Sequence, residues 1–244
     1  MTKPKKKQKR ALKNILIVCA LVIAGAAVAA FTPYFNIERV EILGNSKVDT
    51  QLVYAASELE TGMNIFGVKL SRISANVAKI PYVHKVDVKR TFPNVITIKV
   101  EESRAAAVIP FLEGGVLIDV YGKALERVEA EQFGEYLQLI GVSITNYDLG
   151  KKITVENEKK LKIALENIGE IVHNNIMTEI VEIDTTEIGN IKYKMNGGKL
   201  TVLMADNTNI PYKLNFLKEI MGNLGENPKG VIDFTSKDPT YRVN

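Results

Sequence analysis

An apolar run without a single charge, directly behind a basic N-terminus, constrains this chain more than any other feature. The run is Ile15–Phe31, and it follows seven Lys and Arg residues within the first fourteen positions, which hold no Asp or Glu. A helix rises about 1.5 Å per residue and a hydrocarbon core is about 30 Å thick, so a span needs roughly twenty residues. Residues 15–35 therefore predict one transmembrane helix, with Tyr34 and Phe35 at the membrane–water interface.

The seven cations set the expected orientation. Positively charged flanks stay on the cytoplasmic side, so 1–14 is predicted as a cytoplasmic basic tail and 36–244 as extracellular. Two alternatives remain: the basic run as a nucleic-acid or nuclear signal, and a cleaved signal peptide ending at the small-x-small sequence Ala27-Val28-Ala29. The apolar stretch is longer than a usual signal core, which favours a retained single-pass anchor in the cell membrane.

Composition limits the function of the external part. The whole chain has a formal charge of +4, and without the seven N-terminal cations the remainder carries −3. The external part thus has no basic excess with which to bind nucleic acid. The one cysteine, Cys19, lies inside the apolar run, so no intrachain disulfide can form. This pattern fits a bacterial surface protein that folds without oxidation.

The first external segment, 36–104, has the pattern of a small domain with the order β-α-α-β-β. Its last two strands form a hairpin, and Asp49 is the expected N-cap of the first helix. Such a unit is stable when both helices cover one face of the sheet. The predicted elements are a strand at 37–43, helices over 52–59 and 70–80, and strands at 83–90 and 95–101.

The second segment, 105–235, predicts a larger, mainly antiparallel α+β domain. Its helices are expected over 156–174 and 211–224, each with an apolar stripe at helical spacing. A short tail, 236–244, follows. The predicted strands lie at 105–111, 115–120, 124–128, 136–140, 180–184, 188–195, 199–205 and 230–234. The fold class is therefore α+β, with one N-terminal transmembrane helix and two external domains.

Several motifs follow one another along the chain: Phe35-x-Ile37-x-x-Val40-x-Ile42-x-Gly44-Asn45, Ile80-Pro81-Tyr82-Val83, Val86-x-Val88, Arg90-x-Phe92-Pro93-Asn94, Ile96-x-Ile98-x-Val100-Glu101, Leu117-Ile118-Asp119-x-x-Gly122 and the closing helix–strand 213–234. In this order, they resemble the FtsQ/DivIB family of bacterial division proteins. The resemblance covers nearly the whole chain and implies that 36–104 is a POTRA domain and 105–235 the family's β domain. The sequence departs from the family at Glu102, where a basic residue is usual, and in its short C-terminal tail.

No residue pattern predicts catalysis, a metal or a cofactor. His84 is expected at the surface, and His173 near a helix end is expected to interact with the helix dipole. Asp119, Asp184 and Asp233 each end a strand, where turn hydrogen bonding explains an aspartate. A pair of carboxylates for glycan hydrolysis is not singled out. We therefore predict a protein that is not an enzyme.

Binding is better supported, because a strand at a sheet edge offers unpaired N–H and C=O groups to an incoming strand. Both 95–101 and 231–236 are predicted edge strands, with Ile232 and Phe234 pointing inward. The resemblance implies that the strand after the last helix receives an FtsB/DivIC-type partner. Matching by position, the partner-binding residues are Val231, Ile232, Asp233, Phe234, Thr235 and Ser236, with Tyr241 and Arg242 beside them.

Taken together, these patterns predict a non-enzymatic scaffold of the division machinery. It would bind FtsL- and FtsB/DivIC-type single-pass proteins at the septum and link them to septal peptidoglycan synthesis, with no small-molecule substrate. An alternative is a POTRA-containing factor in protein translocation or outer-membrane assembly. Such chains usually carry several POTRA repeats and a long β-barrel, whereas this sequence shows one POTRA-like unit.

Overall fold

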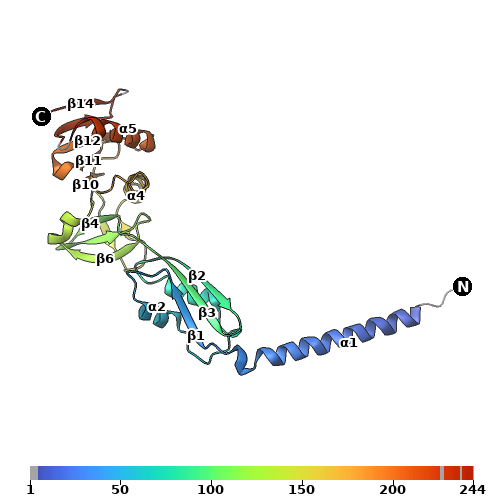
Figure 1. Cartoon of the computed structure of the whole chain (residues 1–244). Coiled ribbons are helices and arrows are strands. Elements are labelled where there is room, and N and C mark those ends of the chain that lie inside the picture. The colour runs from blue at the N-terminus through green and yellow to red at the C-terminus, as the bar shows by residue number, and fades with distance from the viewer. Residues whose placement is uncertain (1–4, 226–227, 237, 244) are drawn as a thin grey trace. The chain divides into compact units, whose positions relative to one another are not determined.

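The computed structural model describes residues 5–225, 228–236 and 238–243, and it shows a mixed α+β protein with one N-terminal apolar helix (Figure 1). The chain divides into two compact units. The first comprises Met1–Ala78 and His84–Glu102, and the second comprises Lys79–Val83 and Ser103–Asn244.

Helix α1 (Lys5–Ala30) contains the apolar run except Phe31 and extends into the predicted basic tail, whose first four residues lie outside the described ones. Within the described residues, Leu12–Ala30 is the one helical stretch long and apolar enough to cross a membrane, with a mean hydropathy of 2.3 and no part buried. The helix ends five residues before the predicted end of the span, and Pro33–Phe35 form a separate 3₁₀ turn, η1. The Thr32 hydroxyl donates to the Ala29 carbonyl at 2.7 Å, and Pro33 has no N–H to continue the ladder.

The first unit has the predicted β-α-α-β-β order, in a sheet that we call the small sheet. Its strand order is β1-β3-β2. Helices α2 and α3 pack against each other. The elements are β1 (Arg39–Leu43), α2 (Thr50–Ser57), α3 (Leu70–Val77), β2 (Val83–Thr91) and β3 (Val95–Glu102).

Local sequence explains these elements. Ile96, Ile98 and Val100 on β3 are buried, whereas Lys99 and Glu101 between and after them are exposed, as a two-residue period requires. The predicted N-cap is confirmed, because the Asp49 carboxylate accepts a hydrogen bond from the Gln51 N–H at 2.6 Å.

The prediction that 95–101 is an edge strand is wrong. Strand β1 pairs with β3 in parallel, from Arg39 opposite Val95 to Leu43 opposite Lys99, and β2 lies on the other side of β3. β3 is therefore central, and its backbone groups are engaged on both sides.

The second unit is built on a mixed sheet that we call the large sheet. Within the described residues it has nine strands in the order β14-β13-β12-β11-β10-β7-β4-β5-β6. Three neighbouring pairs are parallel, namely β12–β13, β10–β7 and β4–β7, and the others are antiparallel. Its strands are β4 (Ala107–Phe111), β5 (Gly114–Ile118), β6 (Ala124–Glu129), β7 (Gln138–Ile140), β10 (Ile180–Asp184), β11 (Ile191–Met195), β12 (Leu200–Ala205), β13 (Gly230–Asp233) and β14 (Thr240–Arg242).

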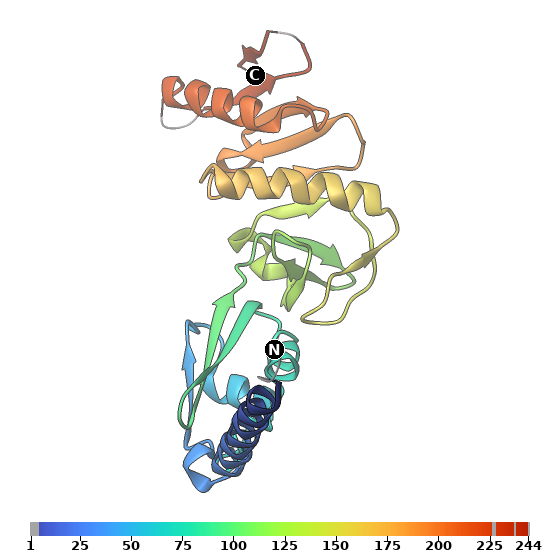
Figure 2. The same ribbon diagram turned by 90° about the vertical axis from the view of Figure 1, so that its right-hand side faces the viewer.

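Two helices cover one face of the large sheet. Helices α4 and α5 pack beside each other across it (Figure 2). Leu161, Ala164, Ile168 and Ile171 of α4 are buried, which confirms most of the predicted stripe. The remaining elements of this unit are α4 (Glu158–His173), α5 (Ile210–Asn223), the 3₁₀ helices η2 (Ala130–Glu135) and η3 (Asn196–Gly198), and a separate ribbon of β8 (Ile144–Asn146) and β9 (Thr154–Val155).

A buried polar network joins α4 to the centre of the large sheet. Asn167, fully buried on α4, accepts a hydrogen bond from the Tyr193 hydroxyl of β11 and donates to the Ile163 carbonyl at 2.7 Å and to the Asn207 side chain. Burial raises the pKa of Tyr193, which keeps the phenol neutral as the donor. The network satisfies each of these buried groups.

The segment Lys79–Val83 is part of the second unit, where it is hydrogen-bonded to Lys123 in the turn after β5. The Lys123 ammonium donates to the carbonyls of Val83 at 2.6 Å and Ile80 at 3.2 Å, and burial lowers the pKa of Lys123 although Asp119 opposes the shift. The buried Asp119 carboxylate accepts hydrogen bonds from the Ser103 hydroxyl and from the N–H groups of Tyr121 and Lys123 at 2.9 to 3.0 Å. The aspartate of the Leu117-Ile118-Asp119 motif therefore organises a turn.

Candidate partner-binding edge

The predicted binding strand is not the outermost strand of the large sheet. β13 pairs in parallel with β12 on one side and in antiparallel with β14 on the other. β14 lies within the segment expected to be a short C-terminal tail. The expectation of a free backbone edge at Val231–Ser236 is therefore wrong, and the exposed edge at this end of the sheet belongs to Thr240–Arg242.

Part of the predicted side-chain pattern is confirmed. Ile232 and Phe234 point into the core, with 0% and 6% of their surface exposed. The Phe234 ring meets Phe216 of α5 edge to face at 6.2 Å, which ties the end of β13 to the covering helix. Of the remaining candidates, Val231 and Asp233 are half-buried and Thr235 and Ser236 are exposed. The buried pair thus anchors the edge, while Tyr241 and Arg242 lie on it.

Two side-chain contacts hold β14 in place. The Arg242 guanidinium lies 3.1 Å from the Asp233 carboxylate, and the Tyr241 hydroxyl donates to the Lys229 carbonyl at 2.8 Å. Asp233 also accepts hydrogen bonds from the hydroxyl and N–H of Thr235 at 2.6 and 2.8 Å. The hydrogen bonds from Thr235, with the nearby Arg242 charge, lower the pKa of Asp233. The carboxylate is thus ionised at neutral pH and pairs with the edge strand.

Gly230 permits the close approach of β14. Its φ is +122°, and a Cβ at this position would lie 2.0 Å from the Arg242 carbonyl oxygen. A residue with a side chain would meet both a strained backbone conformation and a collision with the edge strand. Pairing of β14 therefore requires a glycine at position 230, and this glycine is one feature of the sequence that indicates a strand beside β13.

The sequence contains two further signals for β14. Thr240-Tyr241-Arg242-Val243 is rich in β-prone residues, and Pro239 before it favours an extended chain. Strand β14 has only three residues, which is too few for an alternation of apolar and polar residues to be recognised. Exposed apolar side chains lie directly after β14 and on α5, since Val243 and Tyr212 are 72% and 64% exposed.

The aspartates and Glu102 have structural roles. Asp184 accepts from the Thr186 N–H at 2.9 Å, so the predicted turn role of the three strand-end aspartates is confirmed. The Glu102 carboxylate accepts from the N–H groups of Ser46, Val48 and Lys47 at 2.7, 2.8 and 3.1 Å. Desolvation works to raise the pKa of Glu102, but these three donors prevail and lower it. The acidic residue thus fixes the turn after β1.

Little in the described part of the chain suggests catalysis. Across those residues no three His, Cys, Asp or Glu side chains are placed to hold a metal ion. His84 is exposed, as predicted, and His173 lies exposed in the last turn of α4, near the helix end where it was expected. The chemistry at the C-terminal edge is instead that of strand pairing: backbone donors and acceptors, an ion pair and exposed apolar side chains.

Comparison with known proteins finds similarity to bacterial cell division proteins. A family model for the POTRA domain of the FtsQ type matches residues 35–103. DivIB of Clostridium botulinum (strain Hall) is 27% identical, covering 99% of this chain and 94% of the relative. DivIB of Clostridium acetobutylicum is 28% identical over 86% of this chain and 84% of the relative. FtsQ of Syntrophotalea carbinolica is 26% identical over 96% and 81%, respectively.

An apolar N-terminal helix, a POTRA domain of the FtsQ type and a large mixed sheet define a POTRA protein with one candidate membrane anchor. The similarity to proteins named DivIB and FtsQ extends over nearly the full chain. Residues 35–103, which match the FtsQ-type POTRA model, lie within this full-length similarity to bacterial cell division proteins.

Proposed function

We propose that this protein is a non-enzymatic scaffold of the division machinery. It binds FtsL- and FtsB/DivIC-type single-pass proteins at the septum and links them to septal peptidoglycan synthesis. The support is the similarity to division proteins over nearly the full chain, together with a sheet edge suited to strand addition. The single observation that carries the binding role is the short, exposed β14 at that edge.

The proposed topology follows from charge. The apolar span Leu12–Ala30 of α1 is preceded by most of the N-terminal basic residues, which the positive-inside bias keeps in the cytoplasm, and the folded units follow it. The two units then lie outside the cell, where the division synthases build the wall. A protease added to protoplasts, whose wall is removed but whose membrane is sealed, should cleave the external units and leave the basic tail intact. Cleavage of the basic tail with intact external units would contradict this orientation.

The partner segment binds as an added strand. β14 offers one row of N–H and C=O groups away from β13, and an incoming extended segment satisfies them with backbone hydrogen bonds. The exposed apolar side chain of Val243, directly after β14, adds contact area. The partner therefore extends the large sheet beyond β14.

Proline substitutions on β14 test this interface. Successive residues of an edge strand direct their N–H groups alternately toward the neighbouring strand and away from it. Tyr241→Pro and Arg242→Pro therefore remove one donor toward β13 and one donor toward the partner. We expect the variant that retains the wild-type unfolding temperature to lose affinity for the partner's external domain at least tenfold in a pull-down or titration.

The matched control is a proline at an exposed position of another edge, Arg39→Pro at the start of β1. This variant should leave partner binding by the large sheet unchanged. Unaltered binding by both β14 variants would show that the partner uses another surface. A proline at Asp233, inside the sheet, is uninformative because β13 is paired on both sides.

Depletion in cells tests the wider role. Filamentous cells without septa support a division scaffold, and expression of the β14 variant that folds but does not bind should fail to restore septa. Normal division after depletion, with defects in protein export or outer-membrane assembly, would overturn the proposal in favour of a translocation factor.

A further inference from the structure

A chain of exposed aromatic rings leads from the end of α1 across the first unit. Tyr34 meets Phe35 at a centroid distance of 5.1 Å, Phe35 meets Phe66 at 5.2 Å and Phe66 meets Phe92 at 5.4 Å. Tyr34, Phe66 and Phe92 remain 66%, 45% and 58% exposed. We call these four residues the aromatic ladder. Three separate segments contribute to it: η1, the loop before α3 and the β2–β3 turn.

The rings are held outward by a rigid backbone. The Arg90 guanidinium donates to the carbonyls of Ile65 and Val68, both at 2.8 Å, on either side of Phe66. The Ile65 N–H donates to the Phe35 carbonyl at 2.9 Å, and Ile65 is fully buried. The loop therefore fixes Phe66 at the surface. Single exposed apolar residues need no explanation, but a connected set on three segments marks an interaction surface.

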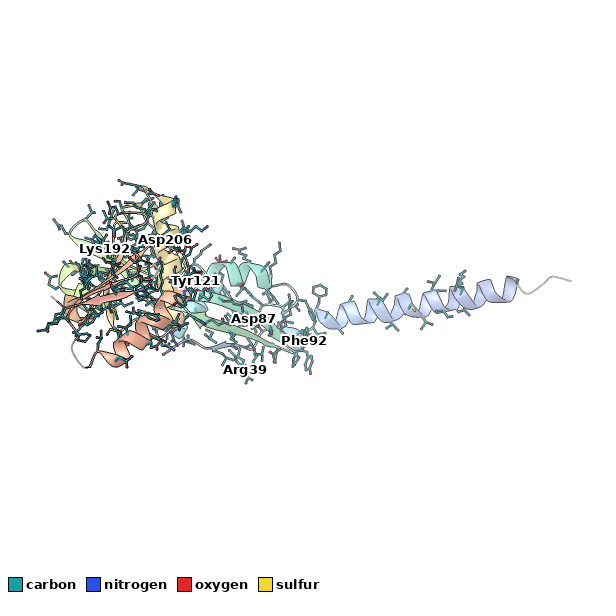
Figure 3. The ribbon with its side chains drawn as sticks, turned by 90° about the horizontal axis from the view of Figure 1, so that it is seen from above. Arg39, Asp87, Phe92, Tyr121, Lys192 and Asp206 are labelled. Carbon is teal, nitrogen blue, oxygen red and sulfur yellow. The ribbon has the colours of Figure 1, made fainter. Side chains whose placement is uncertain are left out.

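The end of the apolar helix lies against the same loop. The Asn64 side chain donates to the carbonyl of Ala30, the last residue of α1, at 2.8 Å, and its oxygen accepts from the Phe66 N–H at 3.0 Å. Figure 3 labels Phe92 at the end of this unit nearest α1. The ladder is thus continuous with the helix that is apolar enough to span a membrane.

Length places this junction at the membrane boundary. The apolar span Leu12–Ala30 has 19 residues, and at about 1.5 Å per residue it is about as long as a hydrocarbon core is thick. Ala30 then marks one edge of the hydrocarbon, and the ladder begins four residues later. Tyr and other amphipathic aromatic rings concentrate in the headgroup layer just outside this edge.

We infer that the aromatic ladder docks the POTRA domain onto the lipid headgroup layer, with Phe66 and Phe92 inserted in the bilayer interface beside α1. The occupant is the lipid surface, because the ladder starts four residues after the span and Asn64 hydrogen-bonds both to Ala30, the span's last residue, and to Phe66 of the ladder. The inference rests on α1 crossing the membrane. It makes the POTRA domain a membrane-seated platform, with its orientation set by the rings and by the short connection at Thr32–Asn36.

Single tryptophan reporters test the inference, because the chain has no Trp of its own. The full chain is placed in lipid nanodiscs at one copy per disc, with brominated phosphatidylcholine as the quencher. Phe66→Trp and Phe92→Trp should each lose about half of their fluorescence to brominated lipid, with emission shifted to shorter wavelength. Adding Phe66→Ser to the Phe92→Trp variant should reduce this quenching, because the ladder is interrupted.

Two controls separate the inference from the anchor on which it depends. Val22→Trp, in the middle of α1, should be strongly quenched, and Tyr212→Trp, 64% exposed on α5 of the second unit, should not be. Quenching of Val22→Trp without quenching of Phe66→Trp or Phe92→Trp overturns the docking while leaving the span intact. No quenching at any of the three positions overturns both. A shift of the ladder reporters' emission to shorter wavelength only at two or more copies per disc, without quenching by brominated lipid, would show that the ladder binds a second chain instead of lipid.

Discussion

The two sheets of this protein end in edge strands that are fixed very differently. β1 of the small sheet has a five-residue parallel register with β3, and the turn that follows it is held by three hydrogen bonds to Glu102. β14 of the large sheet has three paired residues, none fully buried, and is held by one ion pair and one tyrosine contact. The first edge is integral to its sheet, whereas the second is a short outer strand, at which we propose that a partner strand is added.

Two glycines test this difference with the same structural change. A Cβ at Gly44 would lie 2.3 Å from the Val100 carbonyl oxygen, and one at Gly230 would lie 2.0 Å from the Arg242 carbonyl oxygen, both at positive φ. We expect Gly44→Ala to lower the free energy of unfolding of the first unit by about 3 kcal/mol or more, because β1 cannot move away from β3. Gly230→Ala should cost only about 1 kcal/mol, because β14 detaches.

Hydrogen exchange followed by mass spectrometry of peptides distinguishes the two outcomes strand by strand. Gly44→Ala should raise exchange throughout β1, β2 and β3, and Gly230→Ala only in β14 and its neighbour. Gly62→Ala is the control, since its φ is +91° but no atom lies within 4 Å of the added Cβ. Global opening of the second unit by Gly230→Ala would show that β14 is integral to the large sheet.

The buried network under the large sheet gives the next largest effect. Asn167→Ala leaves the buried Tyr193 hydroxyl without its acceptor, and we expect the second unit to lose about 2 kcal/mol. Exchange should rise in β10, β11 and β12, in contrast to the edge-limited effect of Gly230→Ala. The matched control is Asn190→Ala, which removes a surface contact to Glu187. Equal losses from both asparagine variants would contradict the role of the network.

The same contrast explains what could be predicted from sequence. In the small sheet, alternation places Ile96, Ile98 and Val100 on one face, and the order of elements follows from local patterns. The position of β3 between β1 and β2 was missed, because a parallel pairing between residues more than fifty positions apart leaves no local mark. In the large sheet, β7 between β10 and β4 depends on long-range pairing in the same way.

The candidate site was likewise predictable only in part. Alternation correctly placed Ile232 and Phe234 in the core. The covering strand β14 depends on Gly230 and on the Asp233–Arg242 pair, and neither contact is visible as a periodicity. The hydrogen bonds that Glu102 accepts from the turn after β1 were also not predicted, because their donors lie more than fifty residues earlier in the sequence.

Glu102→Gln sharpens the comparison at the first edge. The carboxylate pKa lies below its ordinary value of 4.5, because three N–H donors favour the charged form over the opposing desolvation. Its contribution is therefore complete above pH 4.5 and is lost as the pH falls through the lowered pKa. We expect the variant to lose about 1.5 kcal/mol at neutral pH, and the difference from wild type to shrink in acid.

Urea unfolding of both proteins from neutral pH to pH 3 measures this difference, with exchange in β1 as the local readout. Glu101→Gln is the neighbouring control, because Glu101 meets Lys85 at 3.6 Å with both side chains at least half exposed. A constant gap between wild type and Glu102→Gln at every pH would show that shape, and not charge, holds the turn.

Two arginines on the two edge strands give the smallest change in stability and the most direct comparison. Arg39 on β1 pairs with Glu41 at 2.9 Å, and Arg242 on β14 pairs with Asp233 at 3.1 Å, and both arginine side chains are 68% exposed. Both arginines are well solvated, and Asp233, whose side chain is 13% exposed, keeps its hydrogen bonds from Thr235, so each change to alanine should cost about 0.5 kcal/mol or less. Partner binding should nevertheless separate them: Arg242→Ala loosens the strand that receives the partner and should weaken binding severalfold, whereas Arg39→Ala should leave it unchanged. Equal weakening by both variants would mean that net charge, and not the β14 edge, attracts the partner, and a salt titration of wild-type binding would then show a steep dependence.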